Sequence, residues 1–381
     1  MDFSLSSEQL AFKDTVNSFA KDKMEPYASK WDAEKVFPVN VLKEAAKLGL
    51  AAIYVPENLG GTGLGRLDAA LVFEELSSAC ASTAAFLSIH NMTTWMVANY
   101  GSKTIHDKFL NDLITMNYIS SYCLTEPGSG SDAASLSTRA EKKGDYYILN
   151  GTKSFISGAS VSDVYLTMVR TGGEAFKGIS CLLIEENSDG LSFGKLEKKM
   201  GWNSQPTAQV IFENCKVPVE NLVGHEGEGF KIAMQGLDGG RINIGACSIG
   251  AARSCLERSL AYVNERKQFG KKISDFQTIQ FKLADMSTEL EAARLMIYRA
   301  AFELDNKGTQ TTQMCAMAKR FATDIGFKVC NEALQLHGGY GYLSEYSIER
   351  FVRDCRVHQI LEGTNEIMNV IIARILMENR K

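Results

Sequence analysis

The sequence lacks several features that would have assigned it to a class at once. It has no run of 18 apolar residues, which argues against a membrane-spanning helix. It has no basic excess: 41 Lys and Arg face 45 Asp and Glu, so the net charge of -4 gives no electrostatic case for nucleic-acid binding. The motifs H-E-x-x-H, G-x-x-x-x-G-K-[ST] and G-x-S-x-G are absent, and with them the signatures of zinc proteases, P-loop nucleotide hydrolases and serine hydrolases.

Cysteine pairs and metal-ligand spacings are also missing. The nine cysteines are an odd number and form no C-x-x-C pair, which argues against a disulfide framework or a zinc site and favours a reducing compartment. The histidines are dispersed without metal-ligand spacing, so we expect hydrogen-bonded structural residues and no metal. They are His90, His106, His225, His337 and His358.

The first residues, MDFSLSSEQ, contain neither an apolar h-region nor an Arg-rich amphipathic stretch. No targeting peptide is therefore predicted. Because a removed transit peptide would leave the same sequence, we expect a cytoplasmic protein in a bacterium and a mitochondrial matrix protein otherwise.

Apolar periodicity divides the chain into three parts. A capping box of Ser6 and Gln9 opens a first helix, and helical patterns return at 40–50, 67–80 and 83–100. From about residue 119 the pattern changes to strands. Asn150-Gly151 predicts a hairpin turn there, because both residues tolerate positive φ. The strand-rich runs 164–169, 179–184 and 209–212 follow, which together predict a small antiparallel sheet.

Helical spacing returns after about residue 226. Apolar residues from Ile279 to Ile297 alternate by four and three positions, which is typical of a helix in a bundle or at a subunit interface. Ile367, Ile371 and Ile375 indicate a last helix. The sequence therefore predicts an α+β fold with a helical domain at 1–118, an antiparallel β domain at 119–225 and a helical domain at 226–381.

A glycine-rich run lies at the start of the β domain. Gly128 to Ala133 matches the G-x-G-x-x-G/A fingerprint, but a β hairpin and not a helix is predicted after it, so we reject a Rossmann fold. The run could be an ordinary turn. The whole segment YCLTEPGSGSD at 122–132 gathers hydroxyls and backbone N–H groups into one turn, and such nests bind anions or the polar edge of a ring.

Two further segments are candidates for binding a phosphorylated ligand. HGGYGY at 337–342 has small residues that allow close approach of a phosphate, although a helix C-cap followed by a turn explains it equally well. RKQFG at 266–270 combines a cation, an amide and an aromatic ring, and arginine suits phosphate through its planar fork. The alternative for RKQFG is a solvated helix end.

Glu362, in the segment QILEGTNEI, is the carboxylate that points most clearly to chemistry. It stands among apolar residues just before Gly363-Thr364, which can cap the last helix. Partial desolvation there would raise its pKa towards that of a useful general base. The alternative is an exposed glutamate that stabilises a helix N-terminus.

Together these segments resemble the acyl-CoA dehydrogenase family over nearly the full chain. The blocks YCLTEPGSGSD, KSFISGA, RKQFG, QLHGGYGY and ILEGTNEI occur in the family's order. The resemblance implies the family's architecture, with a C-terminal four-helix bundle. It also implies FAD-dependent α,β-dehydrogenation of a short branched acyl-CoA in valine degradation. The stretches SIHNM, GWNSQPT and GGRINI favour conversion of isobutyryl-CoA to methacrylyl-CoA, with 2-methylbutyryl-CoA and butyryl-CoA as alternatives.

The resemblance also implies roles for individual residues. Glu362 matches the catalytic base, and the substrate-binding positions are Ser131, Asp238, Arg241 and Arg374. The positions that match FAD-binding residues are Tyr122, Cys123, Leu124, Thr125, Gly130, Ser131, Phe155, Ile156, Ser157, Arg266, Gln268, Phe269, Gln277, Gln335, Leu336, His337, Gly338, Gly339, Thr364 and Glu366.

The implied reaction starts with removal of the α-proton by Glu362, while the β-hydride passes to flavin N5. The enolate oxygen would be stabilised by the backbone N–H of the base and a flavin ribityl hydroxyl. Some family members carry the base on an earlier helix, in the stretch corresponding to 237–241. Here Gly239 and Gly240 offer no side chain there, and Asp238 is the only acid, so we favour Glu362.

The family further implies an electron-transfer flavoprotein as electron acceptor and a homotetramer built as a dimer of dimers, with Arg266, Gln268 and Phe269 near a dimer interface. An acyl-CoA oxidase is a less favoured alternative, because such oxidases usually extend beyond the point at which this chain ends. Two others remain: an acyl-CoA-binding scaffold without turnover and a purely structural helical bundle.

Overall fold

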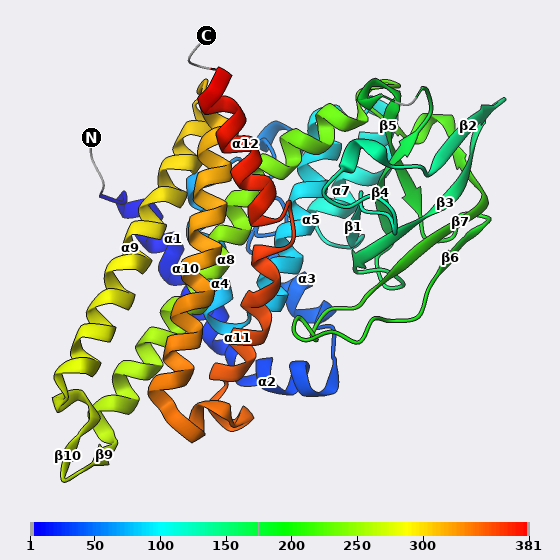
Figure 1. Cartoon of the computed structure of the whole chain (residues 1–381). Helices are drawn as coiled ribbons and strands as arrows, with labels where there is room; N and C mark the ends of the chain where they lie inside the picture. Colours follow the sequence, from blue (N-terminus) through cyan, green and yellow to red (C-terminus); the bar gives the residue numbers. More distant parts are fainter. Residues whose placement is uncertain (1–3, 174, 379–381) are drawn as a thin grey trace.

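The computed structural model describes residues 4–173 and 175–378, which form a helical part, a β-sheet and a second helical part (Figure 1). The predicted capping box is confirmed, since Gln9 N donates to Ser6 Oγ and Ser6 N donates to Gln9 Oε1. The helices of the first part are α1 (Ser7–Phe19), α2 (Glu25–Glu34), α3 (Val39–Lys47), α4 (Arg66–Ala79), α5 (Ala81–Tyr100), α6 (Lys103–Ile105) and α7 (Asn111–Ile114).

The sheet has the strand order β6-β7-β3-β2-β4-β5-β8, and β1 pairs with β4 beside this path. Most neighbours are antiparallel, as predicted, but β1 and β2 both run parallel to β4. The strands are β1 (Ser120–Cys123), β2 (Arg139–Lys143), β3 (Tyr146–Ser157), β4 (Val164–Arg170), β5 (Ile179–Glu185), β6 (Leu191–Phe193), β7 (Thr207–Pro218) and β8 (Leu222–Val223).

The hairpin prediction at Asn150-Gly151 is wrong, because both residues lie inside the continuous strand β3. The pair instead faces a β-bulge on β7, where Asn214 is the extra residue with φ 52° and donates its N–H to Asn150 Oδ1 at 2.9 Å. Gly151 is required by crowding, since a Cβ there would lie 2.5 Å from Thr138 Oγ1. The actual turn before β3 contains Gly144, whose φ is 60°.

The central strand β4 packs on both faces, which explains its almost uninterrupted apolar sequence. Val164, Leu166 and Met168 point into a core shared with α5 and α8, whereas Tyr165 and Val169 point into the interior of the β domain. This two-residue alternation packs one face of β4 against the helices and the other against the interior of the β domain.

The second helical part contains the helices with the predicted heptad seam. Met286, Leu290, Ala293 and Ile297 are buried in the main core, so the seam packs within the bundle. The part of the chain that the structure describes contains no helix long and apolar enough to cross a bilayer. The elements here are α8 (Gly229–Glu265), the hairpin strands β9 (Lys267–Gln268) and β10 (Lys271–Lys272), α9 (Gln277–Asp305), α10 (Thr311–His337), α11 (Ile348–Arg356) and α12 (Asn365–Glu378).

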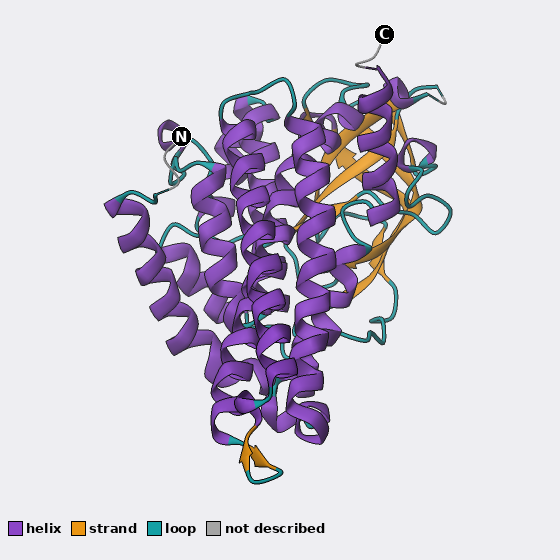
Figure 2. Cartoon of the chain, turned by 60° about the vertical axis from the view of Figure 1, so that its left-hand side comes forward, coloured by secondary structure: helices purple, strands orange, loops and turns teal. Residues whose placement is uncertain are grey.

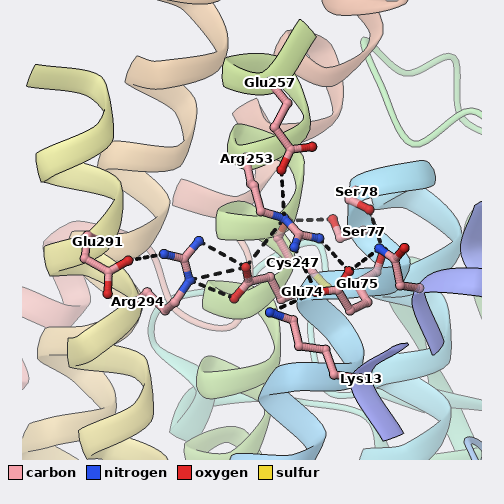
Figure 3. A network of polar contacts seen from close by, with 11 residues as sticks. Lys13, Glu74, Glu75, Ser77, Ser78, Cys247, Arg253, Glu257, Glu291 and Arg294 are labelled. Atoms are coloured by element: carbon pink, nitrogen blue, oxygen red, sulfur yellow. Dashed lines mark hydrogen bonds and ion pairs between the residues drawn. The ribbon is translucent and has the colours of Figure 1, made fainter. Parts of the chain in front are cut away.

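A buried network of charges joins the two helical parts (Figure 3). Glu74 and Glu75 of α4 are 2% and 0% exposed. Arg253 of α8 pairs with Glu75 at 2.7 Å, and Arg294 of α9 pairs with Glu74 at 3.1 Å. Because a buried carboxylate is tolerated only with such partners, these pairs fix α4 against α8 and α9.

Candidate active site

Glu362 lies in a strained turn between α11 and α12. Its φ is 54°, a left-handed conformation that is uncommon outside glycine, and Gly363 follows with φ 91°. Thr364 caps α12 as predicted, because its Oγ1 accepts from Ile367 N at 3.3 Å. A strained non-glycine residue of this kind costs about 1–3 kcal/mol and persists only where its surroundings hold it, which is typical of functional sites.

The Glu362 carboxylate is directed onto the backbone of α8. A Cβ built on Gly240 would lie only 2.7 Å from Glu362 Oε2, so the glycine leaves the space that the carboxylate occupies. Oε2 is buried and has no hydrogen-bond partner among the described residues. Burial raises the pKa of Glu362 to about 7, although Lys319 and Arg241 act to lower it. The group is therefore a carboxylate poised to accept a proton near neutral pH.

Two neighbouring glycines of α8 receive side chains from other helices. Gly236 and Gly239 lie on nearly the same face of α8 as Gly240, at positions i, i+3 and i+4. A Cβ on Gly236 would meet the Met96 methyl group at 1.7 Å, and one on Gly239 would meet Arg66 NH1 at 2.1 Å. The small residues thus let α4, α5 and the Glu362 turn converge on one stretch of helix.

Arg66 is a buried cation in this region that the sequence analysis did not identify. Its guanidinium carbon lies 3.5 Å from the centre of the Tyr54 ring and 5.0 Å from that of Trp95. The residue is 5% exposed, and NH1 has no hydrogen-bond partner among the described residues. Nothing in the local sequence marks Arg66, because its neighbours come from segments far away in the chain.

Asp238, the alternative to Glu362 as the base, has both carboxylate oxygen atoms hydrogen-bonded. Its Oδ1 accepts from Arg241 NH1 at 2.8 Å and its Oδ2 accepts from Thr312 Oγ1 at 2.8 Å. Arg241 also donates from Nε to the carbonyl oxygen of Glu362 at 3.3 Å. Asp238 therefore orients the arginine beneath the Glu362 turn, and neither of its oxygen atoms is free to act as a base.

The predicted cofactor positions separate into two groups, of which the first lies at the C-terminal ends of β1 and β3, where Ser154 N donates to Thr125 O at 2.8 Å. The Tyr122 hydroxyl is buried without a partner among the described residues, and Phe155 is 69% exposed with φ 58° next to a register shift in β3. A Cβ on Gly130 would meet nothing within 4 Å. The members of this group are Tyr122, Cys123, Leu124, Thr125, Gly130, Ser131, Phe155, Ile156 and Ser157.

An ion pair that the sequence did not predict fixes the segment after β1 against β3. Glu126 Oε1 pairs with Lys153 Nζ at 2.7 Å, and Ser137 N donates to Glu126 Oε2 at 2.6 Å. Burial alone would raise the pKa of Glu126, but Lys153 and these donors lower it to about 2. The pair pins the glycine-rich loop onto β3. Glu126 and Ser129 also bridge each other through their backbones, so fewer N–H groups of the turn are free than expected.

The second group lies at the opposite end of the long helices, around the β9–β10 hairpin (Figures 1 and 2). His337 stacks on Tyr262 with ring centres 4.4 Å apart, and Arg266 lies 5.5 Å from the centre of the Tyr340 ring. The hairpin carries Phe269, which is 92% exposed. The members are Arg266, Gln268, Phe269, Gln277, Gln335, Leu336, His337, Gly338 and Gly339.

The remaining predicted positions lie on α12 and just before it. Thr364 and Glu366 adjoin the Glu362 turn, and Glu366 is exposed. Arg374 is exposed on the same helix, roughly 15 Å further along. The structure thus brings Glu362, Asp238 and Arg241 together, and does not bring Arg374 into contact with them.

Family models match three consecutive segments of the chain. The acyl-CoA dehydrogenase N-terminal, middle and C-terminal domains match residues 6–117, 121–215 and 227–377. The chain belongs to the acyl-CoA dehydrogenase family.

Individual relatives and solved structures support this assignment. The chain is 56% identical to the mitochondrial isobutyryl-CoA dehydrogenase of Dictyostelium discoideum, over 98% of this chain and 90% of the relative. The structure of butyryl-CoA dehydrogenase from Megasphaera elsdenii superposes with a TM-score of 0.96 at 36% identity, over 99% of this chain and 100% of that one. The FAD complex of PigA superposes with a TM-score of 0.95 at 31% identity, over 99% of each chain.

The residues present fit the FAD of this family in two respects. At the C-terminal ends of β1 and β3, the unpartnered Tyr122 hydroxyl and the exposed Phe155 ring offer a polar and an aromatic contact. At the far end, Cβ atoms on Gly338 and Gly339 would meet nothing within 4 Å, so a phosphate can approach the backbone there. Since the two groups lie at opposite ends of the helices, one dinucleotide cannot use both in one chain.

Proposed function

We propose that this chain removes hydrogen from Cα and Cβ of a short, branched acyl-CoA to give an α,β-unsaturated thioester, with isobutyryl-CoA as its preferred substrate. The observation that carries the proposal is the Glu362 carboxylate, buried and unpartnered at Oε2, in a strained turn against Gly240. Support for the branched substrate comes from the isobutyryl-CoA dehydrogenase relative.

In the first step Glu362 takes the α-proton of the thioester. Its pKa of about 7 makes a substantial fraction of the carboxylate available as a base near neutral pH, yet keeps the protonated form stable after transfer. The backbone N–H of Glu362 has no acceptor among the described residues, so it is free to donate to the thioester oxygen and stabilise enolate charge.

The positions at the C-terminal ends of β1 and β3, from Tyr122 to Thr125 and from Phe155 to Ser157, would hold the flavin ring, and Thr364 and Glu366 would adjoin it. FAD supplies the acceptor for the hydride that leaves Cβ. The chain's own residues orient the substrate and exclude water from the base, which strengthens its interactions. Arg241, which Asp238 orients, supports the turn through the Glu362 carbonyl oxygen, and both residues would adjoin the acyl group.

We propose a homotetramer in which a partner copy completes the FAD site with its Arg266, Gln268 and Phe269 positions. The separation of the two groups in one chain supports this arrangement. Further support comes from the outer face of α9, where Phe281, Leu295 and Phe302 are 60%, 43% and 62% exposed. Their spacing in multiples of seven places them in one stripe, as in helices that pair.

We also propose an electron-transfer flavoprotein as the acceptor that reoxidises the enzyme, on the basis of family membership. A reducing compartment is supported by the nine cysteines, all buried as free thiols. Butyryl-CoA and 2-methylbutyryl-CoA remain alternative substrates, and the structural likeness to butyryl-CoA dehydrogenase supports the former.

The deciding experiment is the visible spectrum of the purified protein before and after anaerobic addition of isobutyryl-CoA. We expect flavin absorbance that bleaches in the wild type and in Glu345→Gln, an exposed glutamate outside the site. Glu362→Gln should retain its FAD and bind acyl-CoA without bleaching. Bleaching that survives in Glu362→Gln but disappears in Asp238→Asn would reverse the choice of base. A protein that cannot be reconstituted with FAD would instead be a binding scaffold.

A further inference from the structure

Lys319 of α10 is among the largest side chains that are fully buried, with an exposed fraction of 0%. An ammonium group is expensive to bury, and such groups normally pair with a carboxylate. Lys319 Nζ instead donates to two neutral oxygen atoms, Gly363 O at 2.8 Å and Asn365 Oδ1 at 2.9 Å. The described residues provide no carboxylate within ion-pair distance of it.

Both of these acceptors belong to the turn that carries Glu362. Gly363 immediately follows Glu362, and Asn365 is the first residue of α12. Asn365 is itself fixed, since its Nδ2 donates to Asp324 Oδ1 at 2.8 Å on α10. Lys319 therefore ties the strained turn to α10, while Arg241 ties it to α8 through the Glu362 carbonyl oxygen.

The charge of Lys319 also acts on the carboxylate. Burial raises the pKa of Glu362, and the charge of Lys319 is the strongest influence that lowers it. Burial lowers the pKa of Lys319 to about 8, and the charge of Glu362 is the strongest influence that raises it. The two opposite charges thus act on each other without forming an ion pair.

We propose that Lys319 is a positioning residue for the catalytic base: it fixes the Glu362–Gly363 turn through the Gly363 carbonyl and supplies the cation that keeps the buried carboxylate ionised. The inference rests on the proposed function of Glu362 as the base. Without this cation, desolvation would favour the neutral carboxyl group, which cannot accept a proton.

The other groups that face this pair limit what a pH profile reports. Arg241 and Cys247 face Glu362 from α8, Tyr54 from the segment before α4, and Tyr122 from β1. The pKa values of the tyrosine and cysteine groups are raised by burial, so these groups stay neutral near pH 7.

Asp324 and Glu366 also act on Lys319, and both raise its pKa. The pKa of exposed Glu366 is lowered by its own backbone and by Thr364, so it is already ionised well below neutral pH. Lys319 itself has a pKa of about 8, so the wild-type profile near pH 7 reports the Glu362–Lys319 pair, whereas Lys319→Met leaves Glu362 as the group of the pair that titrates there.

The test compares Lys319→Met with Lys319→Arg and with Lys328→Met. Lys328 lies on the same helix, but pairs with Glu289 at the surface at 2.6 Å and is about half exposed. Flavin content and thermal unfolding confirm that each variant is folded. Stopped-flow flavin reduction by isobutyryl-CoA is then recorded between about pH 5.5 and 8.5, where a base of this kind titrates.

We expect reduction in Lys319→Met to be at least about tenfold slower at neutral pH, with a pH midpoint raised by about one unit. Lys319→Arg should restore the midpoint, and Lys328→Met should match the wild type. A second readout is the infrared band of the protonated carboxyl group, identified by its loss in Glu362→Gln. This band should persist to higher pH in Lys319→Met than in the wild type. It can be recorded without turnover.

An unchanged midpoint and an unchanged infrared titration in Lys319→Met would overturn the proposal, even if the rate falls. If Lys319→Met does not fold, Asn365→Ala removes one acceptor and leaves the cation in place. It should slow reduction without moving the midpoint, and a moved midpoint would contradict the role of the charge. A wild type that no short acyl-CoA reduces would refute the proposed function itself, and this outcome is separate from all the others.

Discussion

The contact between Gly240 and Glu362 makes a strong prediction for Gly240→Ala. The added Cβ would lie 2.7 Å from Glu362 Oε2, whereas ordinary contact begins at 3.4 Å. The carboxylate must therefore retreat by about 0.7 Å, or the turn must shift with it. Because that turn is held by Lys319 and Arg241, we expect most of the displacement to fall on the side chain.

We expect Gly240→Ala to slow flavin reduction strongly and to change the stability of the protein little. A misplacement of about 1 Å can cost roughly 100-fold, so 0.7 Å should slow flavin reduction by about 10- to 100-fold, or about 1.4–2.7 kcal/mol of barrier. Alanine stabilises a helix interior over glycine by about 1 kcal/mol, which offsets part of the strain. The thermal midpoint should consequently stay close to that of the wild type.

The assay is single-turnover reduction by isobutyryl-CoA in a stopped-flow instrument, together with thermal unfolding. Gly173→Ala is the matched control, because a Cβ at this exposed loop position meets nothing within 4 Å. A folded Gly240→Ala protein that reduces its flavin at the wild-type rate would show that the carboxylate does not work from the position seen here.

The remaining predictions concern the Glu126–Lys153 ion pair, the proposed base and the assembly. Lys153→Met leaves the buried Glu126 carboxylate without its cation and should cost about 3–5 kcal/mol in urea unfolding. Because the folded pKa of Glu126 is lowered to about 2, its stabilisation is present above about pH 4.5 and is lost as the pH falls towards 2; acid titration of the thermal midpoint should show this only in the wild type. Reduction by substrate should accelerate as the pH rises through about 7, where Glu362 loses its proton. Phe302→Asp should lower the mass measured by light scattering, and an unchanged mass would exclude the α9 face from the interface.

The sequence was informative wherever a signal is local. The capping box of Ser6, the buried seam of α9 and the helix cap at Thr364 all appear as predicted, because each depends on residues within a few turns. The turn predicted at Asn150-Gly151 was wrong because the local signal was considered without its partner strand. The pair lies in β3 opposite a bulge in β7, which is distant in sequence.

The site was predictable only in part. Glu362 carried a visible signal in its apolar surroundings and its following glycine. Lys319 and Arg66 carried none, since each gains its meaning from contacts with residues distant in sequence. Glu126 lies inside the segment YCLTEPGSGSD, but it anchors the loop only through Lys153. The fold of the sheet brings Lys153 close to it.

The glycines of α8 have a consequence for how the enzyme loses its activity. This helix of 37 residues contains Gly229, Gly236, Gly239, Gly240, Gly245 and Gly250, each of which disfavours helix by about 1 kcal/mol relative to alanine. On its own such a segment would not remain helical, so tertiary packing must hold it. No partly folded species can then retain the surface against which the Glu362 carboxylate rests. Loss of helicity, release of the cofactor and inactivation should coincide in a single cooperative transition.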